Sequence, residues 1–285
     1  MLWGLSPIYW NFLDGVPVLD ILANRIAWAV PILAIVVAAR RRWSILWREA
    51  ASRTTVLIAI VAAAMLSINW GIFLWAVSTA HVVEASLGYF INPLLSVALG
   101  VVLLRERLSR AQGVAVAMAT AGVLYMTVKM GSAPWISLVL AVSFATYGLL
   151  KKHHAAAPAL EGLLLETSSL VVPAAIWIGI GLVAGDGGFG TDVGTSMLLA
   201  GAGLMTAAPL LAFGESAKRI PLSTLGLLQY LAPTLQFLLG VVVYNEVVGA
   251  DRLVGFVLVW LGLIVLSTEG LLRRRRSLEF MAASR

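Results

Sequence analysis

Two stretches of the chain decide its fold: residues 84–106, EASLGYFINPLLSVALGVVLLRE, and residues 224–246, TLGLLQYLAPTLQFLLGVVVYNE. Aligned at an offset of 140 residues, they are identical at eight of 23 positions. Leucine and valine match easily in apolar helices, but a mid-helix proline followed by a glycine and a glutamate does not. The informative matches are Pro93/Pro233, Gly100/Gly240 and Glu106/Glu246. The sequence therefore predicts an internal repeat.

The composition around these stretches is that of a membrane protein. Of 285 residues, 60% are hydrophobic and 12% are charged, whereas soluble domains are about 45–50% apolar and about 25% charged. A soluble fold of this size could not hide so much apolar surface. The composition excludes an ordinary soluble enzyme, a disordered chain and a disulfide scaffold. The absence of cysteine also excludes disulfides, thiolate metal sites and cysteine nucleophiles.

Apolar runs bounded by charges, glycine or proline predict an all-α integral membrane protein with ten transmembrane helices. Ser109 and Gln112 form a predicted capping box at the start of the fifth helix. The first helix would be about 20 Å long, short for a hydrocarbon core of about 30 Å, so we expect residues upstream to complete it. The ten predicted spans are residues 1–13, 18–39, 54–79, 83–104, 110–128, 134–151, 158–184, 195–217, 221–243 and 251–272.

The repeat unit is five spans, so the second copy must enter the membrane from the opposite side. We expect a first repeat over residues 1–130, a second over 131–272 and a basic cytoplasmic tail over 273–285. Inverted repeats are typical of secondary transporters, in which substrate binds near the midplane of the membrane and access alternates. The alternative is a duplicated membrane protein that does not transport.

The basic residues predict the orientation. With the N-terminus inside, loops on the inner side contain 17 of the 20 lysines and arginines, including the run 273–276. The positive-inside rule then places both termini in the cytoplasm. Because these residues flank the spans and form no surface interleaved with aromatic residues, a nucleic-acid partner is excluded.

Polar and small residues recur on one face of each predicted fourth span of the two repeats. Their spacings of 3 and 4 residues place them on a single helix face, and they line either a cavity or a tight helix contact. The two faces comprise Ser86, Tyr89, Pro93, Ser96 and Gly100, and Gly226, Gln229, Pro233, Gln236 and Gly240. Asn92 lies beside the first face and Tyr230 beside the second, and both are cavity candidates too. Pro93 and Pro233 are either hinges or static kinks.

Other polar groups lie within predicted spans. Asn69 and Trp70 in the third span could bind a small polar or aromatic substrate, whereas Trp75 suits an interfacial anchor. Arg25 and Glu166 lie at matched repeat positions, each about 10 Å from a membrane surface but in opposite leaflets. Such residues are candidates for function. Glu166 could carry a coupling proton, because burial favours a protonated carboxyl group; structural pairing is the alternative.

The sequence contains no catalytic constellation. No paired carboxylates at a suitable spacing, no H-x-x-x-H, no Walker A sequence and no G-x-S-x-G are present. We therefore expect no cofactor and no metal. Without a nucleotide-binding loop, transport would depend on an ion gradient or proceed downhill.

Several strings resemble a known family. The chain as a whole is similar to the drug/metabolite transporter superfamily, EamA type, and its strings look like the RarD subgroup, described as chloramphenicol-sensitivity proteins. The resemblance implies an exporter in the bacterial cytoplasmic membrane that moves amino acids or other small metabolites, in exchange with protons. The strings are WGLSPIY at 3–9, NR at 24–25, INWG at 68–71, ASLGYFINPL at 85–94 and GLLQYLAPT at 226–234.

Three functions remain to be distinguished. The first is a secondary exporter of small molecules in the lipid bilayer, with protons as the coupling ion. The second is a membrane-embedded enzyme acting on a lipid-linked substrate, and the third is a non-transporting scaffold or regulator. The sequence is compatible with a monomer or a homodimer, since its glycine-rich faces suit internal packing or self-association.

Overall fold

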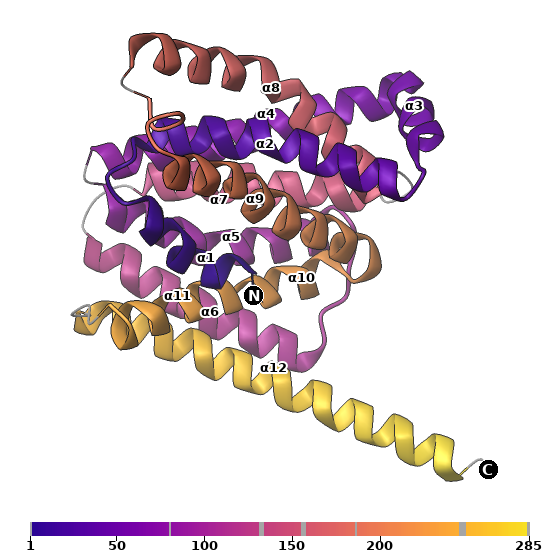
Figure 1. The fold of residues 1–285 in the computed structure, drawn as a ribbon. Coiled ribbons are helices and arrows are strands. Elements are labelled where there is room, and N and C mark those ends of the chain that lie inside the picture. The colour runs from indigo at the N-terminus through magenta and orange to yellow at the C-terminus, as the bar shows by residue number, and fades with distance from the viewer. Residues whose placement is uncertain are drawn as a thin grey trace. The chain divides into compact units, whose positions relative to one another are not determined.

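The computed structural model describes residues 2–79, 81–130, 134–154, 158–185, 187–244 and 249–283. Every regular element in these ranges is a helix (Figure 1). The elements are α1 (Leu2–Trp10), η1 (Asn11–Leu13), α2 (Val18–Ala39), α3 (Trp43–Ala51), α4 (Arg53–Ser78), α5 (Val82–Val102), α6 (Arg110–Met130), α7 (Trp135–His153), α8 (Ala159–Ala184), α9 (Val193–Arg219), α10 (Leu222–Gln229), α11 (Leu231–Val242) and α12 (Ala250–Ala283).

Eight stretches of the described chain are long and apolar enough to cross a membrane: α2, α4 to α9, and α10 together with α11. The apolar part of α12, Leu253–Glu269, is shorter, and α1 has nine residues. The predicted class, an all-α integral membrane protein, is therefore confirmed. Eight of the ten predicted spans meet this criterion within the described residues, and the first and the tenth remain predictions.

Local sequence signals account for several helix ends. The predicted capping box is confirmed. The backbone N–H of Gln112 donates to Ser109 Oγ at 3.1 Å, and the backbone N–H of Ser109 donates to Gln112 Oε1 at 2.8 Å. Asp192 caps α9 by accepting from the Thr195 N–H at 2.8 Å. Hydrogen bonding from Thr195 holds the pKa of Asp192 below its ordinary value. Pro158 directly precedes α8, where its missing N–H costs nothing.

The short helix α3 is not among the ten predicted spans and lies between the second and the third of them, within residues 40–53. Its Trp43 and Trp47 side chains are exposed, and Arg48 lies in its last turn. Tryptophan and arginine beside a membrane span are typical of a helix at the membrane surface. Sequence analysis did not identify it, because nine residues are too few for the periodicity that identifies longer helices.

The chain forms two compact units. Unit 1 comprises Met1–Ala80 and Thr146–Ile220, and unit 2 comprises His81–Ala145 and Pro221–Arg285. Each unit therefore takes helices from both halves of the sequence, and α7 continues from one unit into the other. In unit 1, α2 packs against α8 and α9; in unit 2, α5 packs against α10, and α6 against α12 (Figure 1).

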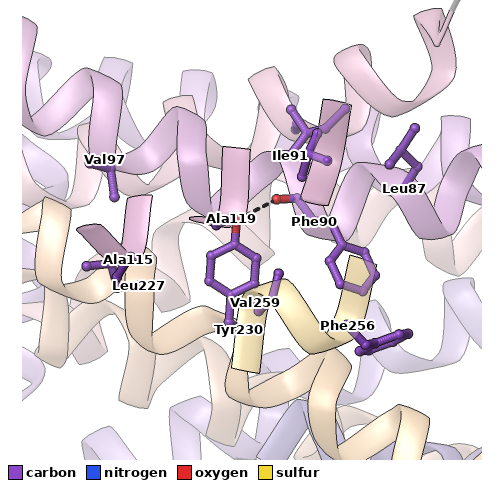
Figure 2. Packing of buried hydrophobic residues seen from close by; sticks show 12 residues of the cluster. Leu87, Phe90, Ile91, Val97, Ala115, Ala119, Leu227, Tyr230, Phe256 and Val259 are labelled. Carbon is purple, nitrogen blue, oxygen red and sulfur yellow. Dashed lines mark hydrogen bonds between the residues drawn. The ribbon is translucent and has the colours of Figure 1, made fainter. Parts of the chain in front are cut away.

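Unit 2 has an aromatic core. Phe90 and Phe256 meet edge to face with ring centroids 4.8 Å apart, and Figure 2 shows Tyr230 beside them with its hydroxyl directed at the Phe90 carbonyl oxygen. Close contacts join α6 to α12. A methyl group on Gly122 would lie 3.1 Å from the Gly255 carbonyl oxygen. Glycine is needed there because it lets two helix backbones approach.

Candidate functional site

In unit 1, the polar site is built around Arg25 of α2. Its Nε donates to Thr206 Oγ1 of α9 at 2.8 Å. Its guanidinium carbon lies 4.6 Å from the ring centroid of Trp70 on α4 and 5.3 Å from that of Trp10 on α1. Four helices thus contribute to one cationic and aromatic group, which we call the Arg25 site (Arg25, Trp10, Trp70 and Thr206).

The surroundings of Arg25 explain how a cation is held inside an apolar helix. Indole faces attract a guanidinium through their quadrupole, by about 0.5–2 kcal/mol for each ring, depending on desolvation. Thr206 is buried and is itself fixed, since its hydroxyl donates to the Ala202 carbonyl at 2.9 Å. Asn69, next to Trp70, is also buried. The site offers positive charge and aromatic faces, which suit an anionic or aromatic group.

Sequence analysis identified Arg25, Asn69 and Trp70 but missed Trp10 and Thr206. No spacing connects Trp10 or Thr206 to Arg25, because each lies on a different helix. A threonine and an interfacial tryptophan are also ordinary residues in membrane helices. Only the packing of α9 on α2, and of α1 on α9, brings them to the site.

In unit 2, three of the predicted cavity residues form a hydrogen-bonded chain. Asn92 Nδ2 donates to Gln229 Oε1 at 2.8 Å, and Gln229 Nε2 donates to Ser96 Oγ at 3.4 Å. Asn92 and Ser96 are buried on α5, and Gln229 is the last residue of α10. Asn92 Oδ1 is buried with no hydrogen-bond partner among the described residues. A buried acceptor of this kind costs about 1–3 kcal/mol and is suited to a donor on a bound molecule or a water.

The small residues of the same face serve helix packing. A methyl group on Gly226 would lie 2.8 Å from the Pro93 carbonyl oxygen and 3.0 Å from Ser96 Cβ. A methyl group on Gly100 would meet a Glu106 carboxylate oxygen at 2.7 Å. Tight helix packing thus explains Gly100 and Gly226, whereas the amides of Asn92 and Gln229 form the hydrogen-bonded chain.

The matched prolines have different surroundings. The helix α5 runs through Pro93 without interruption, whereas the helix around Pro233 is divided at Tyr230 into α10 and α11. Proline cannot donate to the carbonyl four residues earlier, here that of Gln229, and its ring presses on that carbonyl. The Gln229 carbonyl, next to the Gln229 side chain, therefore lacks the N–H donor that a continuous helix would provide.

The remaining cavity candidates lie elsewhere in unit 2. Tyr230 is buried in the aromatic core and donates to the Phe90 carbonyl oxygen at 2.9 Å (Figure 2). Tyr89 on α5 is exposed, and Gln236 on α11 is half-buried. Glu246, which matches Glu106 in the repeat, lies outside the described residues.

Glu166 has its own partners in unit 1. Its Oε1 forms an ion pair with Lys151 Nζ of α7, and its Oε2 accepts from the Tyr147 hydroxyl at 3.4 Å. Glu166 and Lys151 are both buried. Burial of a pair costs desolvation of both ions, so the two must stay together. In the described ranges, no three His, Asp or Glu side chains gather closely enough to ligate a metal.

A chain whose described residues include eight apolar stretches of membrane-spanning length, with charged and amide groups held inside them, is a polytopic membrane protein. Comparison with known proteins refines this class. Residues 1–128 match the EamA-like transporter family. Protein RarD of Streptomyces exfoliatus is 46% identical over 280 residues, which cover 97% of this chain and 88% of the relative. A Bacillus subtilis protein, named as the uncharacterized transporter YojE, is 42% identical over 282 residues, which cover 97% of this chain and 93% of that relative.

A solved protein crystal structure has the same fold, with a TM-score of 0.71 and 20% sequence identity. The match covers 96% of this chain and 94% of the chain in that structure. The sequence identities to RarD and YojE are more than twice as high, and the family assignment rests on them. The chain therefore belongs to the EamA-like transporter family of the drug/metabolite transporter superfamily and is a homologue of the RarD proteins.

Proposed function

We propose that this protein is a secondary transporter that exports small metabolites, amino-acid-like or drug-like, across the bacterial cytoplasmic membrane by alternating access. It is not an enzyme in this proposal, and its partners are the small-molecule substrate and the lipid bilayer. Membership of a family whose members are named as transporters supports the proposal.

The observation that carries it is the Arg25 site. A charged residue within a membrane span is costly, by about 2.5–3.5 kcal/mol on insertion scales, and such residues mark substrate or ion pathways. Here the cation is flanked by Trp10 and Trp70 at 5.3 and 4.6 Å. That arrangement suits a substrate with an anionic or aromatic group.

Two further features support alternating access and coupling. Each compact unit contains helices from both sequence halves, which suits the rocking of bundles built from inverted repeats. Glu166 is the proposed proton carrier, because it is a buried carboxylate within a span. The basic inner loops support a cytoplasmic location for both termini.

The test is efflux from proteoliposomes that contain the full chain. The vesicles are loaded with labelled amino acids, small metabolites and chloramphenicol, and release is followed with and without a pH gradient. We expect protein-dependent release of at least one class, accelerated by the gradient. Release indifferent to the gradient would contradict proton coupling, and Glu166→Gln should abolish the acceleration while leaving downhill release.

Variants connect release to the site. Trp70→Leu should slow release about fivefold, since a cation–π contact of about 1 kcal/mol is lost. Trp75→Leu is the matched control on the same helix and should change release less than twofold. Asn92→Leu and Gln229→Leu should abolish release while the protein still inserts. Normal release in Trp70→Leu would contradict the Arg25 site, and normal release in both Asn92→Leu and Gln229→Leu would contradict the proposed role of the hydrogen-bonded amides of unit 2.

Two results would favour the alternatives. Chemical conversion of a lipid-linked substrate without vectorial movement would favour a membrane enzyme. A cellular phenotype that persists in variants without release would favour a scaffold or regulator.

A further inference from the structure

Unit 1 contains an open groove where the end of α3 meets the first turns of α4. Its volume is about 340 Å³, within the range of about 300–1,000 Å³ that is usual for small-molecule sites. The groove shares no residue with the Arg25 site, and the proposed transport function uses none of its lining. The lining residues are Ala50, Ala51, Arg53, Val56, Leu57 and Ile60.

The groove has a polar end and an apolar end. Arg53 is the first residue of α4 and is exposed. Val56, Leu57 and Ile60 follow it at spacings that place them with Arg53 on one face of the helix. Leu57 is 62% exposed and Ile60 is 50% exposed, so the apolar end is uncovered. Because α4 is a membrane span, the groove leads from the membrane surface at Arg53 about 10 Å into the apolar layer at Ile60.

The helix α3 supplies the other wall of the groove. Trp43, Trp47 and Ala51 are four residues apart and therefore share a face of α3. Both tryptophan side chains are exposed, whereas Leu46 is buried. Exposed tryptophan is typical of the headgroup level of a membrane. The polar end of the groove therefore lies where the phosphate groups of phospholipids lie.

Arg53 leaves its positive charge at this end of the groove. It forms no ion pair within the described part of the chain. The carboxylates of α3 and of its contact with α8 are already engaged, since Glu49 pairs with Arg48 at 3.3 Å and Glu161 pairs with Arg42 at 2.7 Å. A guanidinium group presents its donors in a planar fork that matches the oxygens of a phosphate. The polar end therefore suits a phosphate.

We propose that this groove binds one anionic phospholipid of the leaflet that contains α3. Its phosphate lies on Arg53, and an acyl chain lies along Val56, Leu57 and Ile60. A phospholipid has its charge and its apolar chain in the same order as the groove. An irregular segment of a soluble protein does not fit, because its backbone polar groups would enter the hydrocarbon unpaired. The proposal concerns lipid binding only, so it stands or falls separately from transport.

The test measures the melting temperature of the full-length protein, washed free of lipid in neutral detergent and titrated with dioleoyl phosphatidylglycerol. A ligand that binds only the folded state raises the melting temperature in a saturable way. Dioleoyl phosphatidylcholine is the control lipid, because it has the same chains and no net charge. We expect a saturable rise with phosphatidylglycerol at concentrations where phosphatidylcholine has little effect. No saturable rise with phosphatidylglycerol, or equal effects of the two lipids, would overturn the proposal.

Charge variants assign the effect to the polar end. Arg53→Gln should weaken the apparent affinity for phosphatidylglycerol about tenfold, as expected when a charged hydrogen bond is lost. Arg40→Gln is the matched control, since Arg40 is also exposed, lies in the same connection between α2 and α4, and does not line the groove. It should change the affinity less than twofold. Equal effects of the two variants would indicate a diffuse attraction of basic residues to anionic lipid and would overturn the assignment.

A second pair of variants tests the apolar end. Ala51→Trp fills the groove from α3 and should weaken the affinity to a similar extent as Arg53→Gln. Ser44→Trp, at an exposed position of α3 outside the groove, is the control and should bind as the unmodified protein does. Unchanged affinity in Ala51→Trp would contradict the placement of the acyl chain. A lipid-free dimer in gel filtration that Ala51→Trp dissociates would show that a second copy of the chain covers the groove, and would overturn the proposal.

Discussion

Single residues decide how closely the helices of unit 2 approach. The polar face of α5 meets α10 at Gly226, where a side chain would press on Pro93 and Ser96. Beside this contact, Asn92 and Gln229 exchange a hydrogen bond at 2.8 Å. The same helix face therefore combines close packing with a polar chain, because the glycine brings the amides within reach of each other.

The first prediction concerns Gly226. Gly226→Ala places a methyl group 2.8 Å from the Pro93 carbonyl oxygen, so α5 and α10 must move apart. We expect a loss of stability of about 1–3 kcal/mol, typical of overpacking, measured as a lower melting temperature in detergent.

The matched control is Gly113→Ala on α6 in the same unit, where nothing lies within 4 Å of the added methyl group. It should leave the melting temperature unchanged or raise it, because alanine favours helix. Equal melting temperatures for the two variants would refute the packing argument.

At the scale of helices, contacts at helix ends hold the structure together as well as contacts along helix faces. Glu106 follows α5 and caps α10: its Oε1 accepts from the Leu222 N–H at 2.7 Å and its Oε2 from the Ser223 N–H at 2.8 Å. A carboxylate at a helix N-terminus satisfies free N–H groups and opposes the helix dipole. This gives a structural role to Glu106, the glutamate that ends the first copy of the predicted repeat.

The second prediction concerns this cap. Glu106→Gln removes the charge and one of the two acceptors, so we expect a loss of about 1–2 kcal/mol, measured by thermal unfolding in detergent. Glu215→Gln, at an exposed pair with Arg219, should change stability by less than about 0.5 kcal/mol. A Glu106→Gln variant as stable as Glu215→Gln would rule out the capping role.

The two copies of the repeat are not equivalent as elements. Both contain the matched proline, yet only the second is divided, at Tyr230. The Tyr230 hydroxyl is held by the Phe90 carbonyl in the aromatic core (Figure 2), which anchors the interruption. The proline alone therefore does not determine whether a helix is broken; the neighbouring packing does.

At the scale of the whole molecule, the predicted inverted repeat and the observed compact units divide the chain differently. The repeats are successive in sequence, whereas each unit takes one segment from each half. The predicted repeat boundaries at residues 130 and 272 remain predictions. Orientation in the membrane belongs to this scale too, because it depends on basic residues summed over all inner loops.

The third prediction tests that orientation. The chain has no cysteine, so a single introduced cysteine reports alone. A membrane-impermeant maleimide added to intact cells should label Thr191→Cys, in the loop before α9. It should label Ala51→Cys, at the end of α3, only after permeabilisation. Both positions are exposed. The opposite labelling pattern would invert the topology and place the termini outside.

Hydropathy, charge and turn signals in the sequence predicted the class, the positions of most of the long helices and the capping box, and short strings carried the family resemblance. These features are encoded locally, since each depends on residues within one or two helical turns or on sums along the chain. They also identified Arg25, Trp70, Asn92 and Gln229 as polar groups that lipid would reject.

Tertiary structure alone decided which of these groups meet. Trp10 and Thr206 join Arg25, Lys151 joins Glu166, and Lys218 lines the same cavity as that pair, each from a different helix. No spacing along the chain encodes such contacts. They arise from which helix faces pack together, and that depends on side-chain shape across helices rather than on periodicity within one.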